Sequence, residues 1–536
     1  MDGRAFENLN NDGEEKFFNF RPCLFLAVFL WLGIVFAWWC LKNGVSAWWS
    51  VSVFGVSPLL FAYFKRKRAL WIGFALALSF IVGVFSYTVR ADDFSNTQFY
   101  HSYDSILYGR VLNRTVDGET TCLLLDDLSI DGKAEKGKLV AYLPTSSCEN
   151  IRLSDLVFVR GWFESRTELF GKDATFAEYF ADDIRFCVNA EKISVSGHKF
   201  DAFAEIKEVL RSRLCEGMGE ETTSVAFAIL TGDSSGINDG LLDGVRRGGG
   251  AHIFAVSGLH IGTLYALCIF LFGKIRFLKG RKILSFSLVA LVLLFYGGVC
   301  GYTESVLRAV IMCLVLYASN LIGVKRDTVE SISFASILLL IINPASLFCV
   351  GFLLSFVACY GIAFLGKPLQ VWLEKKYRLS TGRESEYPVS YAREGRGKTF
   401  SFLGVTIGAQ VSTAPILLNA YGYLSGWGFF LNAIFVPCVG FVFSVTLGCA
   451  FLAMLLPSVL STAILWLPNL LWTVVLLIFY AFEFPVIFNG VTLNGAFIFC
   501  YYALLIVLSG KFNLRRNEKI ALILIFASLC ISAFVI

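Results

Sequence analysis

Apolar residues in this chain fall in blocks that are long enough to cross about 30 Å of hydrocarbon. Of its 536 residues, 56% are hydrophobic and only 16% are charged. The first block, Cys23 to Leu41, is followed by two more blocks and by no small-residue cleavage site, so it is expected to remain as a transmembrane helix. The sequence therefore excludes a soluble fold and predicts a polytopic α-helical membrane protein of about thirteen spans, some of them re-entrant.

Clusters of Lys and Arg between the blocks predict the orientation, because cytoplasmic loops are enriched in these residues. If the loop Lys65 to Arg68 is cytoplasmic, the N-terminus lies inside and the region after Tyr87 lies outside. Four further basic loops then also fall inside, and Ile536 falls outside: Lys274 to Lys282, Lys325 to Asp327, Lys367 to Lys398 and Lys511 to Lys519. These loops account for the net charge of +5, which therefore does not by itself indicate nucleic-acid binding.

The pattern divides the chain into four regions. They are the N-terminal spans (1–88), an extracytoplasmic domain (89–200), amphipathic or re-entrant elements (201–250) and a multispan domain (251–536). In the second region, short alternating runs separated by Gly, Asp and Asn predict a small β domain. About five strands in this length suit a Greek-key barrel of the OB type.

Barrels of that type hold single-stranded nucleic acid by aromatic stacking, and four aromatic residues are candidates for this role: Tyr108, Phe158, Trp162 and Phe163. The alternative is that these aromatics belong to the core of the barrel. Between Arg90 and Lys199 there are thirteen Lys and Arg against eighteen Asp and Glu, a net charge of −5. On charge alone the core interpretation is favoured, and any contact with a polyanion requires a local groove.

The 15 cysteines include no C-x-x-C pair, so the sequence predicts no metal site and no cofactor. Three cysteines lie in the β domain. In an oxidising compartment, Cys122 and Cys148 are candidates for a disulfide that stabilises the barrel by about 3 kcal/mol, with Cys187 as the alternative partner.

Residues Glu220 to Leu259 do not form a simple span. Apolar Val225 to Leu230 is too short, and Gly and Asp residues follow it, beginning with Gly232 and Asp233. A re-entrant element is expected here. The glycines Gly248, Gly249 and Gly250 then precede an apolar helix, and a flexible run before a helix amino end suits a passing phosphate.

The helix expected from Ala251 to Phe272 carries His252, Ser257, Gly258 and His260, and two of the four histidines of the chain lie in it. An ionisable side chain in a membrane helix is costly and is therefore a candidate for function. The alternative is that both histidines bond to neighbouring backbone in a packed bundle. Ser257 and His260 share a face, whereas His252 points away from Ser257.

Further polar residues interrupt later apolar blocks. Glu304 and Arg308 are four residues apart on one predicted span, a spacing at which they are expected to pair. Gln410 and Asn432, with the helix-breaking Pro415 and Pro437, line a cavity or satisfy backbone groups.

These residues carry a resemblance to the ComEC competence family. The segment Leu230 to Asp233 and the motif Gly250 to Gly262 resemble the core motif of that family, and further segments recur in its order: Gly301 to Ala309, Asn343 to Phe356, and Ala409 to Pro437. Thr175 to Ile184 resembles the stretch that links its OB-like domain back to the membrane, although Ala177 stands where the family has Asp.

The resemblance implies a multispan channel in the bacterial cytoplasmic membrane that takes up single-stranded DNA during natural transformation. Membrane lipid surrounds it, and a separate nuclease, a surface DNA-binding protein and a cytoplasmic translocase ATPase are implied partners. Many members carry a metallo-β-lactamase-like domain, but no H-x-H-x-D-H ligand set occurs before Ile536. Transport rather than catalysis is therefore the expected activity.

Two other functions remain open. Ala255 to Gly258 resembles the surroundings of the nucleophile in an intramembrane serine hydrolase, but such a mechanism requires a base on a second helix. His101 and His198 lie in the β domain, so no other membrane histidine is available. A transporter or flippase for another polar or anionic substrate fits the broken helices equally well.

Overall fold

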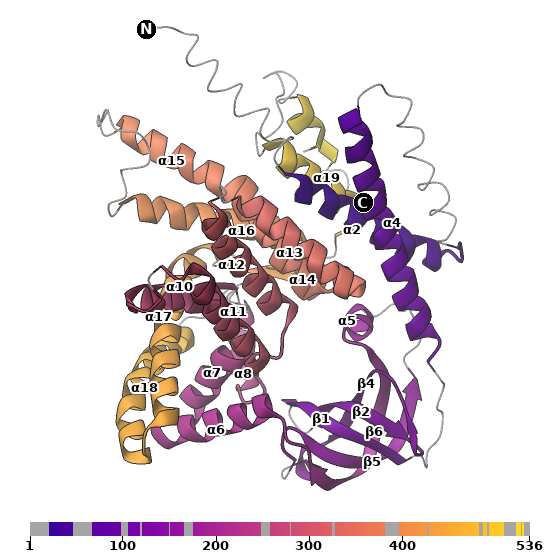
Figure 1. Ribbon diagram of the computed structural model, residues 1–536, viewed down its shortest axis with the longest axis vertical. Coiled ribbons are helices and arrows are strands. Elements are labelled where there is room, and N and C mark those ends of the chain that lie inside the picture. The colour runs from indigo at the N-terminus through magenta and orange to yellow at the C-terminus, as the bar shows by residue number, and fades with distance from the viewer. Residues whose placement is uncertain are drawn as a thin grey trace.

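The computed structural model shows a helical bundle with a β-barrel at one end (Figure 1). It describes residues 21–46, 67–97, 106–117, 120–148, 151–165, 175–247, 258–278, 280–323, 327–380, 396–425, 428–481, 486–489, 493–508, 521–526 and 528–529. Two helices precede the barrel, α2 (Pro22–Lys42) and α4 (Lys67–Ser95). The predicted second span, which lies between them, falls outside the described residues.

The barrel contains six strands, a short 3-10 turn and one helix. They are β1 (Ile106–Asp117), β2 (Thr120–Ile130), β3 (Lys133–Ala134), β4 (Lys138–Pro144), η1 (Thr145–Ser147), β5 (Asp155–Ser165), α5 (Thr175–Ala181) and β6 (Ile184–His198). β1 pairs with both β2 and β5, which closes a barrel of five long strands in the order β1-β2-β4-β6-β5. Among the described strand pairs of the barrel, β4 with β6 is parallel and the others are antiparallel.

Local sequence explains these strands. Along β2, alternate side chains such as Thr121, Leu123 and Leu125 are buried, because successive residues of a strand point to opposite faces. Asp131 and Gly132, both with positive φ, form the two-residue turn between β2 and β3, as expected for an Asp-Gly hairpin.

After the barrel, the chain forms the helical bundle and a two-stranded hairpin. Its elements are α6 (Ala202–Gly217), α7 (Glu220–Thr231), α8 (Asp239–Arg247), α10 (Gly258–Lys274), α11 (Lys282–Val299), α12 (Glu304–Ile322), α13 (Thr328–Ile342), η2 (Pro344–Phe348), α14 (Val350–Gly361), η3 (Ile362–Gly366), α15 (Lys367–Ser380), α16 (Arg396–Tyr421), β7 (Tyr423–Ser425), α17 (Gly428–Leu455), α18 (Ser458–Ala481), β8 (Val486–Asn489) and α19 (Gly495–Leu508).

Eight helices in the described part of the chain are long and apolar enough to cross a membrane. Three shorter apolar helices, Gly258–Lys274, Thr328–Ile342 and Gly495–Val507, accompany them. The structure thus confirms a polytopic helical chain with a barrel inserted near its start, while the number of about thirteen spans stays a prediction. The re-entrant region is broken as expected: α7 has 12 residues, is buried, and ends at Gly232 in the left-handed conformation.

Two joints connect the barrel to the bundle. At the first, the buried Arg185 of β6 bonds to Asp93 at the end of α4 and to Asp183. α5 packs beside it, and Asn343, which follows α13, donates to the Ala181 carbonyl oxygen over 2.8 Å. Thr175 to Ile184 was expected to link the barrel back to the membrane, but it forms α5 and the start of β6.

The second joint is α6, which leads from β6 into the bundle. Asp201 caps this helix by accepting hydrogen bonds from the Phe203 and Ala204 amides. The ring of Phe203 lies 5.8 Å from that of Phe295 on α11. The link back to the bundle is therefore a packed helix.

Candidate functional site

Arg308 lies in the first turns of α12, and only 6% of its surface is exposed. Its Nη1 donates to the Ser355 carbonyl oxygen over 2.7 Å and contacts the Cys359 Sγ at 2.8 Å. Its guanidinium carbon lies 5.8 Å from the centre of the Phe356 ring. α14 therefore holds one edge of the guanidinium group in a fixed position.

The other side of Arg308 faces the start of α10. A Cβ atom at Gly258 would lie 3.0 Å from Arg308 Nη2 and 3.8 Å from the Ala309 Cβ. A side chain at Gly258 would therefore crowd the guanidinium group. Glycine here allows the cation to approach the amino end of α10, where the helix dipole is positive.

His260 follows one half-turn later and is buried between α10 and α17. Its ring centre lies 4.5 Å from that of Phe443. The neighbouring Leu259 lies against Gly440, where a Cβ would be 3.4 Å from Leu259 Cδ2. The start of α10 is thus enclosed by α12 on one side and α17 on the other: Gly258 lies against Arg308, whereas His260 faces α17.

The predicted pairing of Glu304 with Arg308 is wrong. Among the ion pairs of the described residues, none joins these two side chains. The Glu304 carboxylate instead lies close to Ser346 in η2. Each side chain has found a tertiary partner on a different element, and these contacts outweigh the few tenths of a kcal/mol that a helical pair offers.

Glu304 lies near two carboxylates of the barrel. Glu178 of α5 and Asp182, which follows α5, are within electrostatic range of it. Burial raises the pKa of Asp182, and burial together with the Asp182 charge raises the pKa of Glu178. Glu304 therefore belongs to the joint with the barrel rather than to the surroundings of Arg308.

The remaining predicted site residues divide into two groups. One group lies outside the described residues: Gly248, Gly249, Gly250, His252, Ser257 and the side chain of Asn432. Gln410 is on α16, which packs against α14, and among the contacts of the described residues none joins it to Arg308. Asp233 has a local role, because its Oδ1 accepts a hydrogen bond from the Ser235 amide over 3.0 Å and so shapes the turn after α7.

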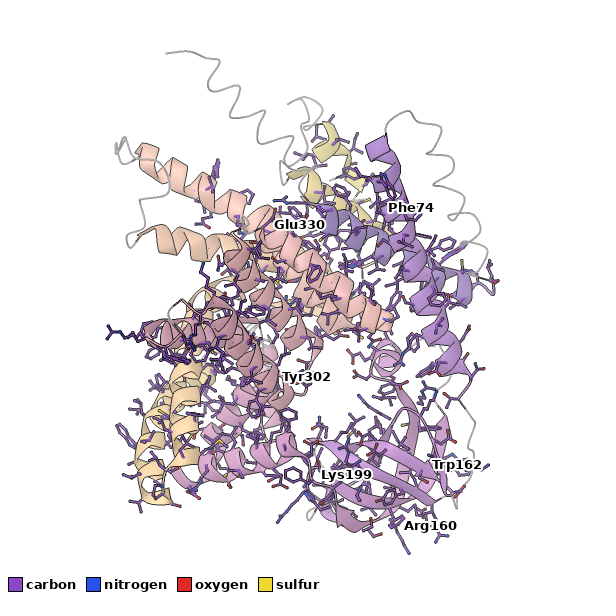
Figure 2. The ribbon with its side chains drawn as sticks, in the orientation of Figure 1. Phe74, Arg160, Trp162, Lys199, Tyr302 and Glu330 are labelled. Atoms are coloured by element: carbon purple, nitrogen blue, oxygen red, sulfur yellow. The ribbon has the colours of Figure 1, made fainter. Side chains whose placement is uncertain are left out.

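On the barrel, β1, β5 and β6 form an outer wall that is rich in aromatic and basic residues. The outer wall consists of Ile106, Tyr108, Phe158, Arg160, Trp162 and Lys192. Phe158 and Trp162 are 42% and 50% exposed, and the rings of Phe158 and Tyr108 are 5.1 Å apart. Figure 2 shows Arg160 and Trp162 on the side of the barrel away from the bundle.

The exposure of Phe158 and Trp162 corrects the interpretation that the barrel aromatics form its core. The side chain of Phe163 lies outside the described residues. Sequence reasoning missed Arg160, which lies between Phe158 and Trp162 on β5, and Lys192, its cross-strand neighbour. The alternation in Phe158-Val-Arg-Gly-Trp162 carried the signal, since every second residue of a strand shares a face.

The predicted disulfide between Cys122 and Cys148 is also wrong. Both are free, as is Cys187. Cys148 is in the barrel core, whereas Cys122 alternates with the core residues Thr121 and Leu123 and therefore points to the opposite face. A thiol inside the barrel core and a thiol that points away from the core cannot reach each other.

Comparison with known proteins is consistent with this architecture. The family described as competence protein matches residues 229–513. ComE operon protein 3 of Bacillus subtilis (strain 168) is 26% identical over 236 residues, which are 44% of this chain and 29% of that protein. No solved structure matches the chain. Because the family match covers more than half of the chain, including α10, α12 and α14, this protein belongs to the ComEC-type competence protein family.

Proposed function

We propose that this protein takes up DNA during natural transformation by passing a single strand across the cytoplasmic membrane. The observation that carries the proposal is the outer wall, in which Phe158, Arg160 and Trp162 alternate on a barrel joined to a membrane bundle. Aromatic rings stack on bases of any sequence, and basic side chains contact the phosphates between them. In this view the protein is a channel, not an enzyme.

The pairing of the barrel strands supports an OB-like fold. The two-residue β3 is set aside here, so β1, β2, β4, β5 and β6 are the five strands of the barrel. β1 pairs with β2 and β5, β2 pairs with β4, and β6 pairs with β4 and β5. The parallel pair is the third with the fifth, β4 with β6. A five-stranded Greek-key barrel of this kind commonly binds oligonucleotides.

The position of charged residues supports an extracytoplasmic barrel. At one end of α13, Asp327 pairs with Arg21 over 2.7 Å, and Lys367 donates to Thr328 over 2.9 Å. At the other end of α13, Asn343 contacts the barrel. Arg21 and Lys367 and the barrel therefore lie at opposite ends of α13, and the positive-inside rule then supports a barrel on the outer side.

The charge of the barrel region favours an outer wall that contacts the bases of DNA more than its phosphate backbone. The region from Arg90 to Lys199 has a net charge of −5, which repels a polyanion over most of its surface. Arg160 and Lys192 place positive charge beside the exposed aromatic rings. We therefore propose that a single strand, whose bases are accessible, is the form of DNA that the wall engages.

Complementation of a deletion strain tests the proposal. The wild-type gene should restore transformation, and a Phe158→Ala, Trp162→Ala double variant should transform at least about tenfold less well, because stacking contributes about 1–3 kcal/mol per base. Phe200→Ala is the matched control, because Phe200 is an exposed aromatic residue that follows β6 outside the wall. Membrane levels of each variant are measured in parallel.

Two results would contradict the proposal. Normal transformation in the deletion strain would exclude a role in DNA uptake. Wild-type transformation by the double variant at equal membrane levels would exclude the outer wall as the DNA contact.

A further inference from the structure

Arg308 is deeply buried and has no counter-ion among the residues that the structure describes. It is 6% exposed, and within the described part of the chain no carboxylate pairs with it. The acidic residue of its own helix, Glu304, lies close to Ser346 of η2 instead. Burying an uncompensated cation is costly, so such a residue in a membrane bundle indicates a function that requires the charge.

The hydrogen bonds of Arg308 leave one edge of its guanidinium group available. Nη1 is occupied by the Ser355 carbonyl and the Cys359 sulfur. Among the described residues, the buried Nε has no hydrogen-bond partner, and Nη2 faces Gly258 without a bond. Nε and Nη2 form the side-on pair of donors with which arginine binds a carboxylate or phosphate through two parallel hydrogen bonds.

The start of α10 lies at this available edge. Gly258 has no side chain to block it, and the 17-residue helix directs the positive end of its dipole there. We propose that Arg308 and the amino end of α10 form a binding site for one phosphate-type oxyanion inside the bundle. That the oxyanion is a phosphodiester of a passing DNA strand rests on the proposed function; the binding of phosphate does not.

Thermal unfolding of the full-length protein in detergent tests the site with inorganic phosphate as the probe. Phosphate, compared with chloride at equal ionic strength, should raise the unfolding temperature of the wild type, because a ligand that binds only the folded state stabilises it. Arg308→Gln should lose this response. Arg308→Gln removes the charge and the paired donors, and its side chain is two bonds shorter, so the Nη1 contact with the Ser355 carbonyl is removed as well.

Two further variants make the result specific. Arg213→Gln removes a positive charge from α6, where Arg213 pairs with Glu216 over 3.2 Å, and should respond to phosphate as the wild type does. Arg308→Lys keeps the charge and loses the paired donors, so it should respond less than the wild type. Arg308→Lys also tests the site if Arg308→Gln does not fold.

The source of the oxyanion is distinguished with oligo-dT and with lipid. Arg308→Gln should weaken oligo-dT binding about tenfold and lower the slope of log K against log salt by about 0.7, as expected for one lost phosphate contact. An uncharged methylphosphonate oligomer should bind wild type and variant equally. If phosphatidylglycerol nanodiscs, compared with phosphatidylcholine nanodiscs, stabilise the wild type but not Arg308→Gln, the site binds a lipid headgroup and its assignment to the phosphodiester of a DNA strand is overturned.

The outcomes separate the two proposals. Equal responses to phosphate and equal oligo-dT binding by the wild type, Arg308→Gln and Arg308→Lys would overturn the site. A response to inorganic phosphate that requires Arg308, in a protein that binds no oligo-dT, would support the site and contradict the proposed function.

Discussion

Gly33 of α2 lies directly against the carbonyl oxygen of Phe80 in α4, so that a Cβ at Gly33 would be 2.2 Å from that oxygen. Gly83 of α4 approaches the Leu30 carbonyl oxygen of α2 in the same way, at 2.4 Å. The two helices that precede the barrel therefore cross in backbone contact. Small residues allow such close crossings between membrane helices, where dispersion contacts replace the hydrophobic driving force.

Gly33→Ala should destabilise the packing of α2 on α4. The obstructing atom is a backbone carbonyl oxygen, which cannot rotate away, so the helices must separate at a cost of about 1–3 kcal/mol. Unfolding in mixed micelles measures the change. Gly273→Ala in α10 is the matched control, because nothing lies within 4 Å of a Cβ there; equal effects of both substitutions would contradict the close crossing.

Arg185→Gln should loosen the joint between α4 and the barrel. Arg185 is 3% exposed and bonds to Asp93, Asp183 and Thr97. Removing the buried guanidinium group should cost about 1–3 kcal/mol, because its hydrogen bonds are lost while Asp93 and Asp183, which are partly exposed, keep their contacts with Lys136 and Arg90. Faster amide hydrogen exchange in β6 and at the end of α4 reports the change.

Lys136→Gln is the control for this joint. Lys136 also faces Asp93, at 3.7 Å, but it is exposed, and a surface pair of this kind contributes at most about 1 kcal/mol. Exchange in β6 that is no faster in Arg185→Gln than in Lys136→Gln would show that the barrel is held elsewhere.

The second joint should weaken as the pH rises. His198 bonds to Asp155 through Nδ1 over 2.9 Å and to Glu205 of α6 through Nε2 over 3.1 Å. The Asp155 hydrogen bond and then the Glu205 contact raise the pKa of His198 above its ordinary 6.5. The stabilisation is therefore complete below pH 6.5 and is lost as the pH passes the raised value.

Hydrogen exchange in α6, corrected for the intrinsic pH dependence, measures this effect. Exchange should rise between pH 6 and pH 9 in the wild type. His198→Gln, which cannot take up a proton, should show a flat corrected profile. A flat wild-type profile would exclude His198 as the titrating group of the joint.

Cys122→Ser should change the stability of the barrel by no more than about 0.5 kcal/mol, as expected for a partly exposed position away from the core. Loss of a disulfide would cost about 2–5 kcal/mol. Alkylation of the unfolded, unreduced protein should label both Cys122 and Cys148. If both thiols are labelled only after a reductant is added, the two cysteines form a disulfide, and their assignment as free thiols is contradicted.

The candidate site was predictable only in part. Motif and polarity pointed to His260 and Arg308 separately, because a charged or polar residue in an apolar block is conspicuous whatever surrounds it. Sequence spacing assigned Arg308 to Glu304, its neighbour on the same helix. In the folded chain the contacts of Arg308 are Ser355, Cys359 and Gly258, which lie on two other helices.

The sequence by itself determined the membrane helices and the β domain, since both follow from periodicity and block length, which are local properties of the chain. It also contained the alternation that puts Phe158 and Trp162 on one face. Only the tertiary structure decided that this face is exposed, that Cys122 and Cys148 point apart, and that Arg308 meets the start of α10. Each of these depends on which elements pack together. Packing brings together residues that are far apart in the chain, and a single sequence does not indicate which distant residues will be in contact.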